Sequence, residues 1–571
     1  MKPNRSHLAV AVLLLFTVSC GSMKTLESTR TPNNERSAEE DDSFFGGASP
    51  DQKTVAQLLA DYEKRKVQVF KKNNSIPSPD AKKMEVLARY IDFLKLPESE
   101  KSVVQARLFE SSIQFLFCSP DDWACLQSAS PITPLAPHRL DTEPGLGAPV
   151  KVNSPLKIDY FFTEQWYRTR KNVNTEQNVK IRDHAGIAGE LEKVINKNWQ
   201  RVSMAIYGID GIGEIDKQTK QPNNSMLGVF NAIKSQPNIR AVVDVEAYKN
   251  VTESRKPEIS YQYPPTAQLY DFMNQGSDPD RMKLRIEWPT ANIMHNKFFV
   301  FEDRDEKSVW TGTANISKNC MGDEDFANLS VYIKNKEVAD AYLKEFDEMF
   351  NYIPANEVKA PIKIGRFHQN KRPNTRRYFV FSDKTELTLH FSPTDDGEHR
   401  AILPLLYSAG EGDVIRISMF GSGGSGGAEY VRAIQYAAAK GADVMVFVDR
   451  DTSFQISNSW INRKAAVRLQ EKNPYGPVKG RLQIKHSDWG MGNMDHHKTA
   501  TLTRKTSRGM VPQVLVVGSQ NWSVAGNDEN DENMIVLKNS SQGLQIAKDY
   551  NEHFDKLLWP TGKTVEFEAG K

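Results

Sequence analysis

The sequence predicts an α/β protein with two similar lobes, each a mostly parallel sheet flanked by helices, and a small helical region ahead of them. Three observations lead to this fold class. Segments in the order strand, helix, strand occur beyond about residue 180, and this order is typical of parallel sheets covered by helices. A second series of such segments follows about two hundred residues later. Both series end in a helix with the same apolar spacing. We expect a pseudo-two-fold axis between the lobes.

The predicted elements agree between the two series in type and order. Each series opens with the string Arg-x-Ser-Met, at residues 201–204 and 416–419. Apolar residues at helical spacing then predict a helix, and short apolar runs predict the strands around it. The helices are expected at 227–235 and 429–440, and the later strands at 241–245, 284–286, 444–448 and 482–484.

The helix that ends each series has apolar residues at positions i, i+3, i+7 and i+11. This spacing places four side chains on one face of a helix, which we expect to be buried. The two sets are Ala339, Tyr342, Phe346 and Phe350 in the first series, and Ala547, Tyr550, Phe554 and Leu558 in the second.

These elements suggest the domain boundaries. The first lobe is expected at residues 182–360 and the second at 375–562, with a connector at 361–374 that is rich in Lys, Arg and Asn. Ahead of them, residues 53–150 carry apolar residues at helical spacing and end in a Pro-rich stretch. We interpret that segment as a separate helical region.

Residues 1–20 have the features of an export signal. Lys2 and Arg5 precede an apolar run at 8–18, which is too short to span a bilayer but suits a secretory signal peptide. The run leads to Cys20 in a context that resembles a bacterial lipoprotein box. Thr17 replaces the Leu that is usual there. The resemblance implies that Cys20 is lipidated and becomes the new N-terminus.

An ordinary cleaved signal peptide is the alternative, and it would give a freely secreted protein. In both cases the protein is exported, and with a lipid it would be anchored to a membrane of the cell envelope. The polar segment 21–52 is then a flexible linker. Loss of Lys2 and Arg5 brings the formal charge from +2 to zero. Any affinity for a polyanion must therefore be local.

The composition and the cysteines narrow the class of protein. Among 571 residues, 39% are hydrophobic and 26% are charged, which excludes a disordered or membrane-embedded chain. Cys118 and Cys125 are close in sequence, and a small disulfide loop between them is plausible in an exported protein. Cys320 then stands alone, as a small buried residue.

Residues suited to phosphate chemistry also occur twice. Each series has a His-x-Lys string and, some twenty residues later, a Gly-[Ser/Thr]-x-Asn string. A strand directs residues two apart to the same side, so the His and the Lys of each pair can face one site. The six residues are His295, Lys297 and Asn315, and His496, Lys498 and Asn521.

Two opposed imidazoles suit a two-step cleavage of a phosphodiester. One neutral imidazole attacks phosphorus and forms a covalent phosphohistidine, while the other, as imidazolium, protonates the leaving oxygen. Water, deprotonated by the second imidazole, then releases the phosphate. Lysines and amides stabilise the charge on the non-bridging oxygens. This chemistry requires neither a metal ion nor another cofactor.

The duplicated strings resemble those of the phospholipase D superfamily, over about residues 182–560. The residues around the strings are similar to those of the PLD-like subgroup that includes many bacterial nucleases. The resemblance implies two PLD-like lobes and a phosphodiesterase whose site lies between them. Thr313 and Ser519, within the Gly-[Ser/Thr]-x-Asn strings, are then expected to contact the substrate.

Two departures from the family pattern concern carboxylates. The family has an Asp five residues after each Lys, and here Glu302 and Thr503 occupy those positions. The family also has an Asn-x-Glu-Asn pattern after the Asn string. The second half keeps it at 530–533, with Glu532 as the acid, whereas the first-half counterpart, aligned at 325–328, has Ala327 at that position.

In the family, this acid hydrogen-bonds a catalytic histidine, commonly the one of the opposite half. The resemblance therefore implies that Glu532 orients His295. A carboxylate stabilises an imidazolium, so our hypothesis makes His295 the nucleophile and His496 the general acid.

Plainer interpretations exist for several residues. His497 is expected to face away from the site, because side chains alternate along a strand. A metal site at Asp495, His496 and His497 is a weaker alternative. Trp310 and Trp522 could stack bases, but core packing is the commoner role of a Trp at the end of a strand.

Three functions remain. The leading one is a phospholipase D-type phosphodiesterase that converts a phospholipid to phosphatidate and a head-group alcohol. The alternatives are a secreted, metal-independent endonuclease of the same superfamily and a non-catalytic envelope protein that kept the fold. Since the repeat supplies both halves of the site, a monomer suffices.

Overall fold

The computed structural model describes most of residues 148–564. The stretches within that range that are not described are 164–166, 172–177, 183–185, 211–213, 216–221, 224–225, 245–263, 276–280, 286–292, 322–325, 352–376, 396, 424–426, 455–458, 460, 462, 464–465, 467–477 and 488–493. Contacts divide the chain into Met1–Ala136 and Pro137–Lys571, and the described residues belong to the second unit. The predicted signal peptide, linker, Cys20, Cys118, Cys125 and most of the N-terminal helical region lie outside them. No helix within the described residues is long and apolar enough to cross a membrane.

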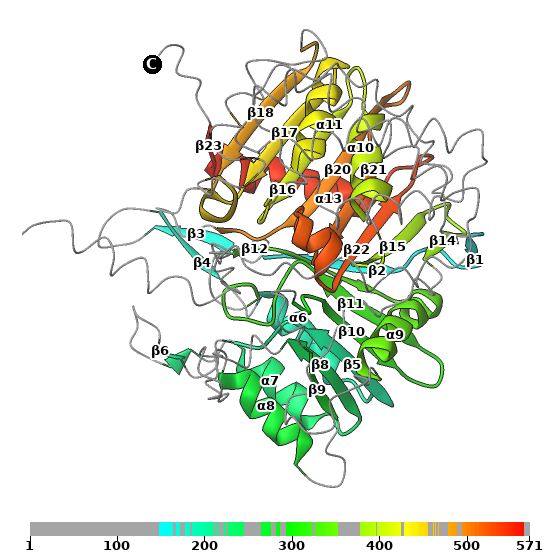
Figure 1. Cartoon of the computed structure of the whole chain (residues 1–571), viewed down its shortest axis with the longest axis vertical. Coiled ribbons are helices and arrows are strands. Elements are labelled where there is room, and N and C mark those ends of the chain that lie inside the picture. Colours follow the sequence, from blue (N-terminus) through cyan, green and yellow to red (C-terminus); the bar gives the residue numbers. More distant parts are fainter. Residues whose placement is uncertain are drawn as a thin grey trace, which may run out of the picture. The chain divides into compact units, whose positions relative to one another are not determined.

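The first lobe is built on a seven-stranded sheet with the order β2-β13-β11-β10-β5-β8-β9 (Figure 1). Its strands are β2 Ile158–Phe162, β5 Arg201–Ile206, β8 Ile239–Asp244, β9 Met282–Arg285, β10 Lys297–Glu302, β11 Lys307–Gly312 and β13 Leu329–Ile333. Its helices are α6 Gly186–Ile195, α7 Leu227–Ser235, α8 Pro264–Asn274 and α9 Lys336–Phe350.

The second lobe is built on a ten-stranded sheet with the order β1-β14-β15-β22-β21-β20-β16-β17-β18-β23. Its strands are β1 Val150–Val152, β14 Tyr378–Phe381, β15 Glu386–Ser392, β16 Val414–Met419, β17 Asp443–Val448, β18 Arg481–His486, β20 Lys498–Thr506, β21 Gly509–Gly518, β22 Glu532–Lys538 and β23 Lys563–Thr564. Its helices are α10 Leu403–Ser408, α11 Gly427–Ala439 and α13 Gln545–His553.

Shorter elements complete the description. Two-stranded pairs are formed by β3 Tyr167–Lys171 with β4 Asn178–Arg182, by β6 Glu214–Ile215 with β7 Pro222–Asn223, and by β12 Phe326–Ala327 with β19 Met494–Asp495. Turns of π-helix occur at Glu398–Ile402, Arg450–Phe454, Ala525–Glu529 and Phe554–Leu558, and a 3₁₀ turn at Trp559–Thr561.

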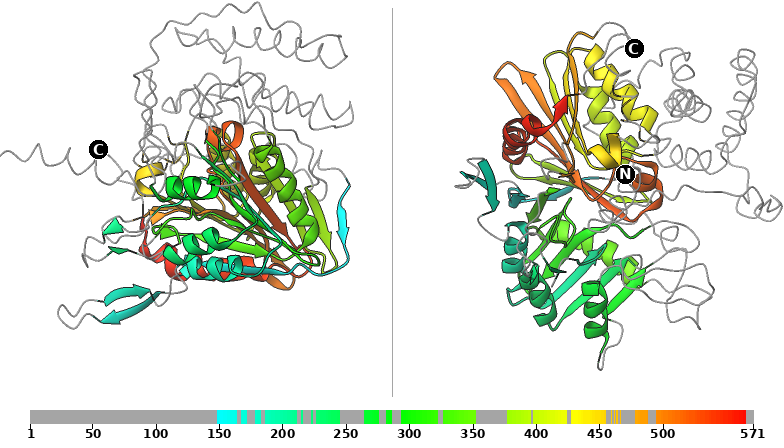
Figure 2. Two further views of the ribbon diagram at one scale, coloured as in Figure 1. Left: turned by 90° about the horizontal axis from the view of Figure 1, so that it is seen from below. Right: turned by 90° about the vertical axis from the view of Figure 1, so that its left-hand side faces the viewer.

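The two sheets share seven strands in the same spatial order. The series β2-β13-β11-β10-β5-β8-β9 corresponds to β15-β22-β21-β20-β16-β17-β18. Both sheets with their helices can be followed in Figure 2, the first lobe in cyan to green and most of the second in yellow-green to red. The predicted α/β class and duplication are confirmed. The first lobe's sheet begins upstream of the predicted boundary at 182, because β2 pairs with β13.

The expectation of mostly parallel sheets is wrong, because both sheets are mixed. Only β5-β8-β9, and likewise β16-β17-β18, form the parallel part of the shared strands, and the others run antiparallel. The cause lies after the His-x-Lys strings. β10 and β11 are joined by the short loop 303–306, and so short a connection permits only antiparallel pairing.

The first strands of the two series are also offset from the alignment that their sequences suggest. Lys297 lies opposite Ile206, and Lys498 lies opposite Met419. The two Arg-x-Ser-Met strings are therefore displaced by two residues relative to each other. A displacement of two leaves every side chain on the same face of the sheet, which is why the sequence pattern alone did not show it.

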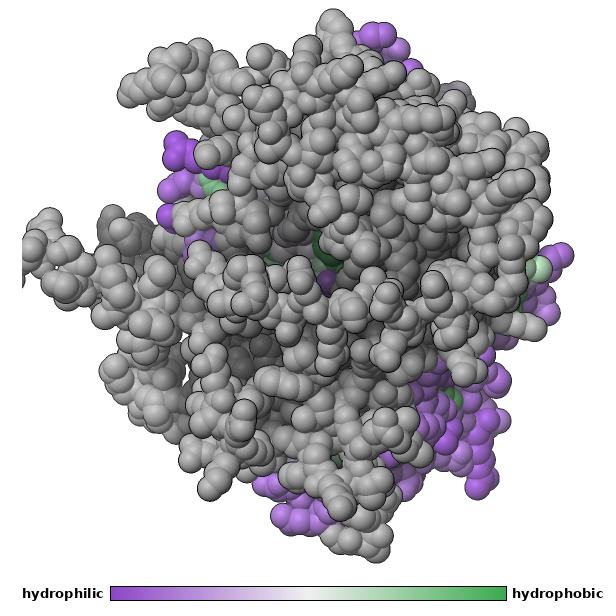
Figure 3. Space-filling model, in the orientation of Figure 1, coloured by the Kyte–Doolittle hydropathy of each residue, from purple (hydrophilic) through white to green (hydrophobic). Residues whose placement is uncertain are grey.

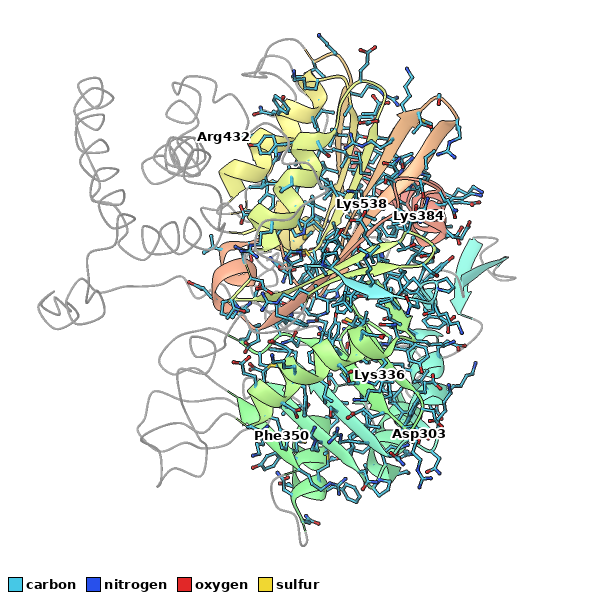
Figure 4. All side chains as sticks on the ribbon, turned by 90° about the vertical axis from the view of Figure 1, so that its right-hand side faces the viewer. Asp303, Lys336, Phe350, Lys384, Arg432 and Lys538 are labelled. Atoms are coloured by element: carbon cyan, nitrogen blue, oxygen red, sulfur yellow. The ribbon has the colours of Figure 1, made fainter. Side chains whose placement is uncertain are left out.

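The helices that end the two series bury the apolar faces that the sequence predicts. Tyr342 and Phe346 on α9 and Tyr550 and Phe554 near the end of the second series are all fully buried. α9, whose first and last residues Lys336 and Phe350 are labelled in Figure 4, packs on β5, β8, β10 and β11. One core cluster includes residues of both lobes.

The described surface contrasts with this core. On the face drawn in Figure 3, the described residues that reach the surface are mostly hydrophilic. The large apolar side chains that are exposed are scattered over separate elements, and they are Leu227, Phe272, Val478, Met510 and Leu557. Scattered apolar residues of this kind are ordinary for a folded protein.

Candidate active site

The two His-x-Lys strings occupy equivalent places in the two sheets. Each lysine is the first residue of a central strand, β10 or β20, and each histidine lies two residues earlier. His295, Lys297, His496 and Lys498 are all buried. The structure therefore places these predicted residues at the same end of the central strands in both sheets.

The backbone of each histidine is held by the other lobe. The backbone N–H of His295 donates to the carbonyl oxygen of Asp531 at 2.9 Å, and that of His496 donates to the carbonyl oxygen of Ala327 at 3.1 Å. Parallel pairing of β12 with β19, and a bridge between Met294 and Asp531, continue these contacts. The two histidines thus lie at the junction of the lobes.

His295 has a carboxylate partner. Its Nδ1 lies 2.8 Å from Oε1 and 2.9 Å from Oε2 of Glu532, and Glu532 is fully buried. The contact that the family resemblance implies is therefore present in the structure. The ring of Tyr207 packs edge-on against the imidazole at 5.5 Å between centroids, which fixes the plane of the ring further.

His496 has an amide partner that the sequence analysis missed. Its Nδ1 lies 2.9 Å from Oδ1 of Asn328. Strand pairing shows why the alignment failed: Gly312 lies opposite Ser330, and Gly518 lies opposite Met534. Asn328 is two residues before Ser330, as Glu532 is two before Met534.

Asn328, rather than Ala327, is therefore the counterpart of Glu532. The predicted alignment matched Asn328 with Asn533, one residue too far along. The local sequence holds no signal that could have corrected it. β13 and β22 are buried on both faces, so their apolar residues match equally well in either alignment.

The two lysines adopt the same conformation in both lobes. Nζ of Lys297 donates to the carbonyl oxygen of His295 at 2.9 Å, and Nζ of Lys498 donates to that of His496 at 3.0 Å. An ammonium group has three N–H donors, so each lysine keeps donors for a phosphate oxygen. The ring of Phe420 lies 4.6 Å from Nζ of Lys498.

The Gly-[Ser/Thr]-x-Asn strings form equivalent turns. The backbone N–H groups of Ser317 and Ser523 each donate, at 2.9 Å, to the carbonyl oxygen of the Asn two residues earlier. Asn315 and Asn521 are 5% and 4% exposed. Each lies three residues after the end of β11 or β21, the strand that pairs with the strand that begins at Lys297 or Lys498.

The glycines of these strings are required by close packing. A Cβ on Gly312 would lie 2.3 Å from the carbonyl oxygen of Leu329, and one on Gly518 would lie 2.1 Å from that of Asn533. Gly312 also has φ +145°, which side chains disfavour. The absence of a side chain lets β13 and β22 approach closely enough to bring Asn328 and Glu532 to the site.

Thr313 and Ser519 hold the strand next to the site. Both residues are buried, and their hydroxyls accept backbone N–H groups of the neighbouring strand, from Leu329 at 3.0 Å and from Asn533 at 2.9 Å. They stabilise the strand that carries Asn328 or Glu532, and their contact with substrate stays a prediction.

Glu302 and Thr503 belong to the sheet rather than to the site. Glu302 is five residues along β10 from Lys297, where it pairs with Arg201 at 2.8 Å and with Lys307 at 3.1 Å. In the second lobe Thr503 lies opposite Val414, in the place of the Glu302–Arg201 pair. Both members of the pair are replaced together, which indicates a structural role.

Burial and mutual repulsion determine the charges in the site. Burial lowers the pKa of His295 to about 4, with the positive charges of Lys297 and Lys498 acting in the same direction and Glu532 opposing them. Burial also lowers the pKa of His496 well below its ordinary value, aided by both lysines and by His295.

The pKa values of the lysines shift in the same direction. Burial lowers the pKa of Lys297 to about 7 and that of Lys498 well below its usual range, the latter aided by Lys297. Groups of one lobe act on groups of the other, so the four basic residues form a single cluster. An anionic phosphodiester would favour their charged forms again, because an opposite charge stabilises a cation.

Other predicted residues have structural roles. His497 is fully buried, with Nδ1 3.2 Å from Oδ1 of Asp495, and packs against Tyr550. Trp310 and Trp522 are buried and stack on Phe161 and Tyr430, so neither can stack on a base. Among the residues that the structure describes, no three His, Cys, Asp or Glu side chains are grouped as metal ligands would be.

The expectation for Cys320 is wrong. Cys320 is disulfide-bonded rather than standing alone. Its Sγ lies 3.8 Å from Nδ1 of His496. A lone-cysteine assignment by elimination depended on pairing Cys118 with Cys125, which spacing along the chain cannot establish.

A protein-family model matches the segments that carry these strings. The family described as "Cardiolipin synthase, PLD-like domain" matches residues 232–350 and 402–559, and each segment contains one His-x-Lys string and one Asn string. No match was found among curated proteins.

Among solved structures, the chain is similar to phosphatidylserine synthase from Haemophilus influenzae Rd KW20, with 14% identity, a TM-score of 0.47, and coverage of 72% of this chain and 89% of that chain. It is also similar to Nuc, a phospholipase D family member from Salmonella typhimurium, with 17% identity, a TM-score of 0.23, and coverage of 32% and 97%. For polyphosphate kinase from Porphyromonas gingivalis these values are 8%, 0.37, 70% and 50%.

Proposed function

Since both halves of this chain carry the PLD-like domain of the phospholipase D superfamily, we propose that the chain hydrolyses phosphodiester bonds through a covalent phosphohistidine. The observation that carries the proposal is the buried cluster of two histidines and two lysines, in which each histidine is held by the backbone of the opposite lobe. The four groups are basic and can take up positive charge when a phosphate anion binds, which suits a phosphodiester substrate.

In the first step, Nε2 of His295 attacks phosphorus and the bond from phosphorus to the leaving oxygen breaks. The imidazolium of His496 gives its Nε2 proton to that oxygen. Lys297 and Lys498, with the amides of Asn315 and Asn521, hold the non-bridging oxygens.

In the second step, neutral His496 removes a proton from water, the water oxygen attacks phosphorus, and the P–N bond to His295 breaks. The phosphorylated ring of His295 is a cation when Nδ1 keeps its proton. Glu532, at 2.8 Å from that nitrogen, stabilises this cation. This contact supports His295 as the nucleophile.

The substrate that we propose is a phospholipid, which would yield phosphatidate and a head-group alcohol. Two points support it: the matching family is described by a lipid-phosphate enzyme, and the predicted lipid on Cys20 would hold the site near a membrane of the cell envelope. A single chain supplies both halves of the site, so we propose that a monomer is active.

The test uses the purified protein on phosphatidylcholine vesicles and on plasmid DNA, with and without EDTA. Release of choline and phosphatidate supports the proposal, whereas nicking of the plasmid would show that the substrate is a nucleic acid. If the protein cleaves neither substrate, the non-catalytic interpretation remains. Transfer of the phosphatidyl group to an added alcohol without release of phosphatidate would contradict hydrolysis.

Variants connect the activity to the site. His295→Ala and His496→Ala should each lower kcat by at least about 10³-fold, because cooperating groups fail together. Lys384→Ala, in the exposed turn labelled in Figure 4, is the control and should retain full activity. Rapid denaturation at alkaline pH, which preserves a P–N bond, followed by mass spectrometry should find the phosphatidyl group on His295. An adduct on His496 would reverse the two roles.

A further inference from the structure

We infer that Asn328 is a positioning residue that fixes the proton of His496 on Nδ1 and keeps His496 the stronger acid of the two histidines. This inference rests on the proposed function and deepens it. It concerns how two histidines in equivalent places of a duplicated fold acquire different tasks.

The orientation of the Asn328 amide follows from its surroundings. Its Nδ2 donates to the carbonyl oxygens of Cys320 at 3.2 Å and Phe326 at 3.1 Å. A carbonyl oxygen can only accept, so the NH₂ group must face these two atoms. Oδ1 then faces His496, and the hydroxyl of Thr313 donates to it as well, at 3.0 Å.

This orientation determines the tautomer of His496. An amide oxygen only accepts hydrogen bonds, so Nδ1 of His496, 2.9 Å away, must carry the proton. The neutral ring then has its lone pair on Nε2, and the charged ring carries its second proton there. Nε2 is the atom that must give and take protons in the reaction.

The surroundings of position 328 favour an amide over a carboxylate. An ionised Asp there would direct one oxygen at the carbonyl oxygens of Cys320 and Phe326, without a proton to share with either. Glu532, in the equivalent place of the second lobe, directs both of its oxygens toward His295 instead. The difference between the lobes is thus supported by neighbouring backbone as well as by the two residues themselves.

The difference has a chemical consequence. The cationic form of His295 has an anionic partner, and the cationic form of His496 has a neutral one. A neutral partner stabilises an imidazolium less than a carboxylate does, so His496 is the stronger acid. It therefore gives a proton to the leaving oxygen more readily, while Glu532 compensates the charge that phosphorylation creates on His295.

The charged and titratable groups that act on His496 strengthen this acidity. Lys498 from its own strand, Lys297 and His295 from the first lobe, and the neighbouring His497 all lower the pKa of His496, after burial. Cys320 is disulfide-bonded, so its sulfur does not titrate. A carboxylate placed at position 328 would oppose all four of these groups.

The test compares Asn328→Asp with Glu532→Gln, its matched counterpart in the other lobe. In a pH profile of kcat the acidic limb follows the group with the lower pKa, which is here His496. On the substrate that wild type cleaves, Asn328→Asp should therefore move the acidic limb upward by one to three pH units, because a carboxylate raises the pKa of His496. Glu532→Gln should leave that limb in place and move the basic limb downward. A lower kcat without a moved acidic limb in Asn328→Asp would show a merely structural role and overturn the inference.

A second measurement determines the tautomer in the wild-type protein itself. In the wild-type protein with ¹⁵N-labelled histidine, the resonances of His496, identified by their loss in His496→Gln, should show the proton on Nδ1 at pH 8. A proton on Nε2 would overturn the inference. This measurement also separates the two proposals. If the wild-type protein has no phosphodiesterase activity, the proposed function is contradicted. The tautomer of His496 tests the role of Asn328 in either case.

Discussion

At the scale of single residues, the site consists of basic groups held in their less charged forms. Four basic side chains are gathered where burial disfavours charge, and one buried carboxylate, Glu532, contacts His295 directly. A substrate phosphate brings the missing negative charge, so binding and protonation of the site are coupled. Protonation of the general acid thus depends on the presence of substrate.

The shifted pKa of His295 predicts a loss of stability in acid. Its pKa is about 4 in the folded protein and near the ordinary 6.5 when unfolded, so the unfolded chain binds more protons between these values. The free energy of unfolding should therefore fall as the pH drops from about 6.5 to about 4, by on the order of 3 kcal/mol from this residue. Denaturant unfolding at a series of pH values measures it.

His295→Gln is the comparison for this prediction, because Gln does not titrate in that range. Its unfolding free energy should change less between pH 6.5 and pH 4 than that of wild type. Equal pH dependence of the two proteins would contradict the assigned pKa shift.

At the scale of elements, the strand ends depend on glycines that allow close backbone contact. Gly518→Ala places a Cβ 2.1 Å from the carbonyl oxygen of Asn533, so β21 or β22 must move. We expect a loss of roughly 1–3 kcal/mol in unfolding free energy, together with reduced activity, because β22 carries Glu532. Gly410→Ala is the control, since no atom lies within 4 Å of its added Cβ. A Gly518→Ala protein as stable as this control would contradict the prediction.

The far ends of the same strands should tolerate change without loss of chemistry. Glu302→Thr copies the residue that the second lobe has in that place. It removes the partner of Arg201 and Lys307, which should cost about 1 kcal/mol. Its kcat should stay within about threefold of wild type, as steady-state kinetics would measure. A loss of activity comparable to that of His295→Ala would give Glu302 a role in the reaction.

At the scale of the whole described unit, the two lobes share one hydrophobic core. Tyr342 of α9 packs edge-on against Phe391 of β15, and Nδ2 of Asn533 donates to Thr311 across the lobes at 2.7 Å. The catalytic histidines add backbone hydrogen bonds between the lobes. Separate unfolding of one lobe would therefore expose core residues of the other.

This arrangement predicts that the lobes unfold in one cooperative transition. Trp310 in the first lobe and Trp522 in the second are both buried, so their fluorescence reports unfolding of each lobe. Urea unfolding is followed by fluorescence in wild type, Trp310→Phe and Trp522→Phe. The part of the fluorescence change that each substitution removes reports on one lobe, and the two parts should have the same midpoint. Midpoints that differ would mean that each lobe is stable alone.

The sequence by itself determined the α/β class, the duplication and the two His-Lys-Asn sets, because these depend on periodicity and on residue types at fixed spacing. The buried stripes of the closing helices were predictable for the same reason. Local patterns of this kind persist whatever the neighbouring elements do.

Only the tertiary structure decided the partners of those residues. Asn328 reaches His496 across 168 positions, and its equivalence to Glu532 is visible only in the pairing of Gly312 with Ser330 and of Gly518 with Met534. The antiparallel strands and the disulfide at Cys320 were likewise beyond local patterns. Pairing between distant strands depends on packing of the whole sheet, and a shift of one or two residues leaves little trace in a single sequence.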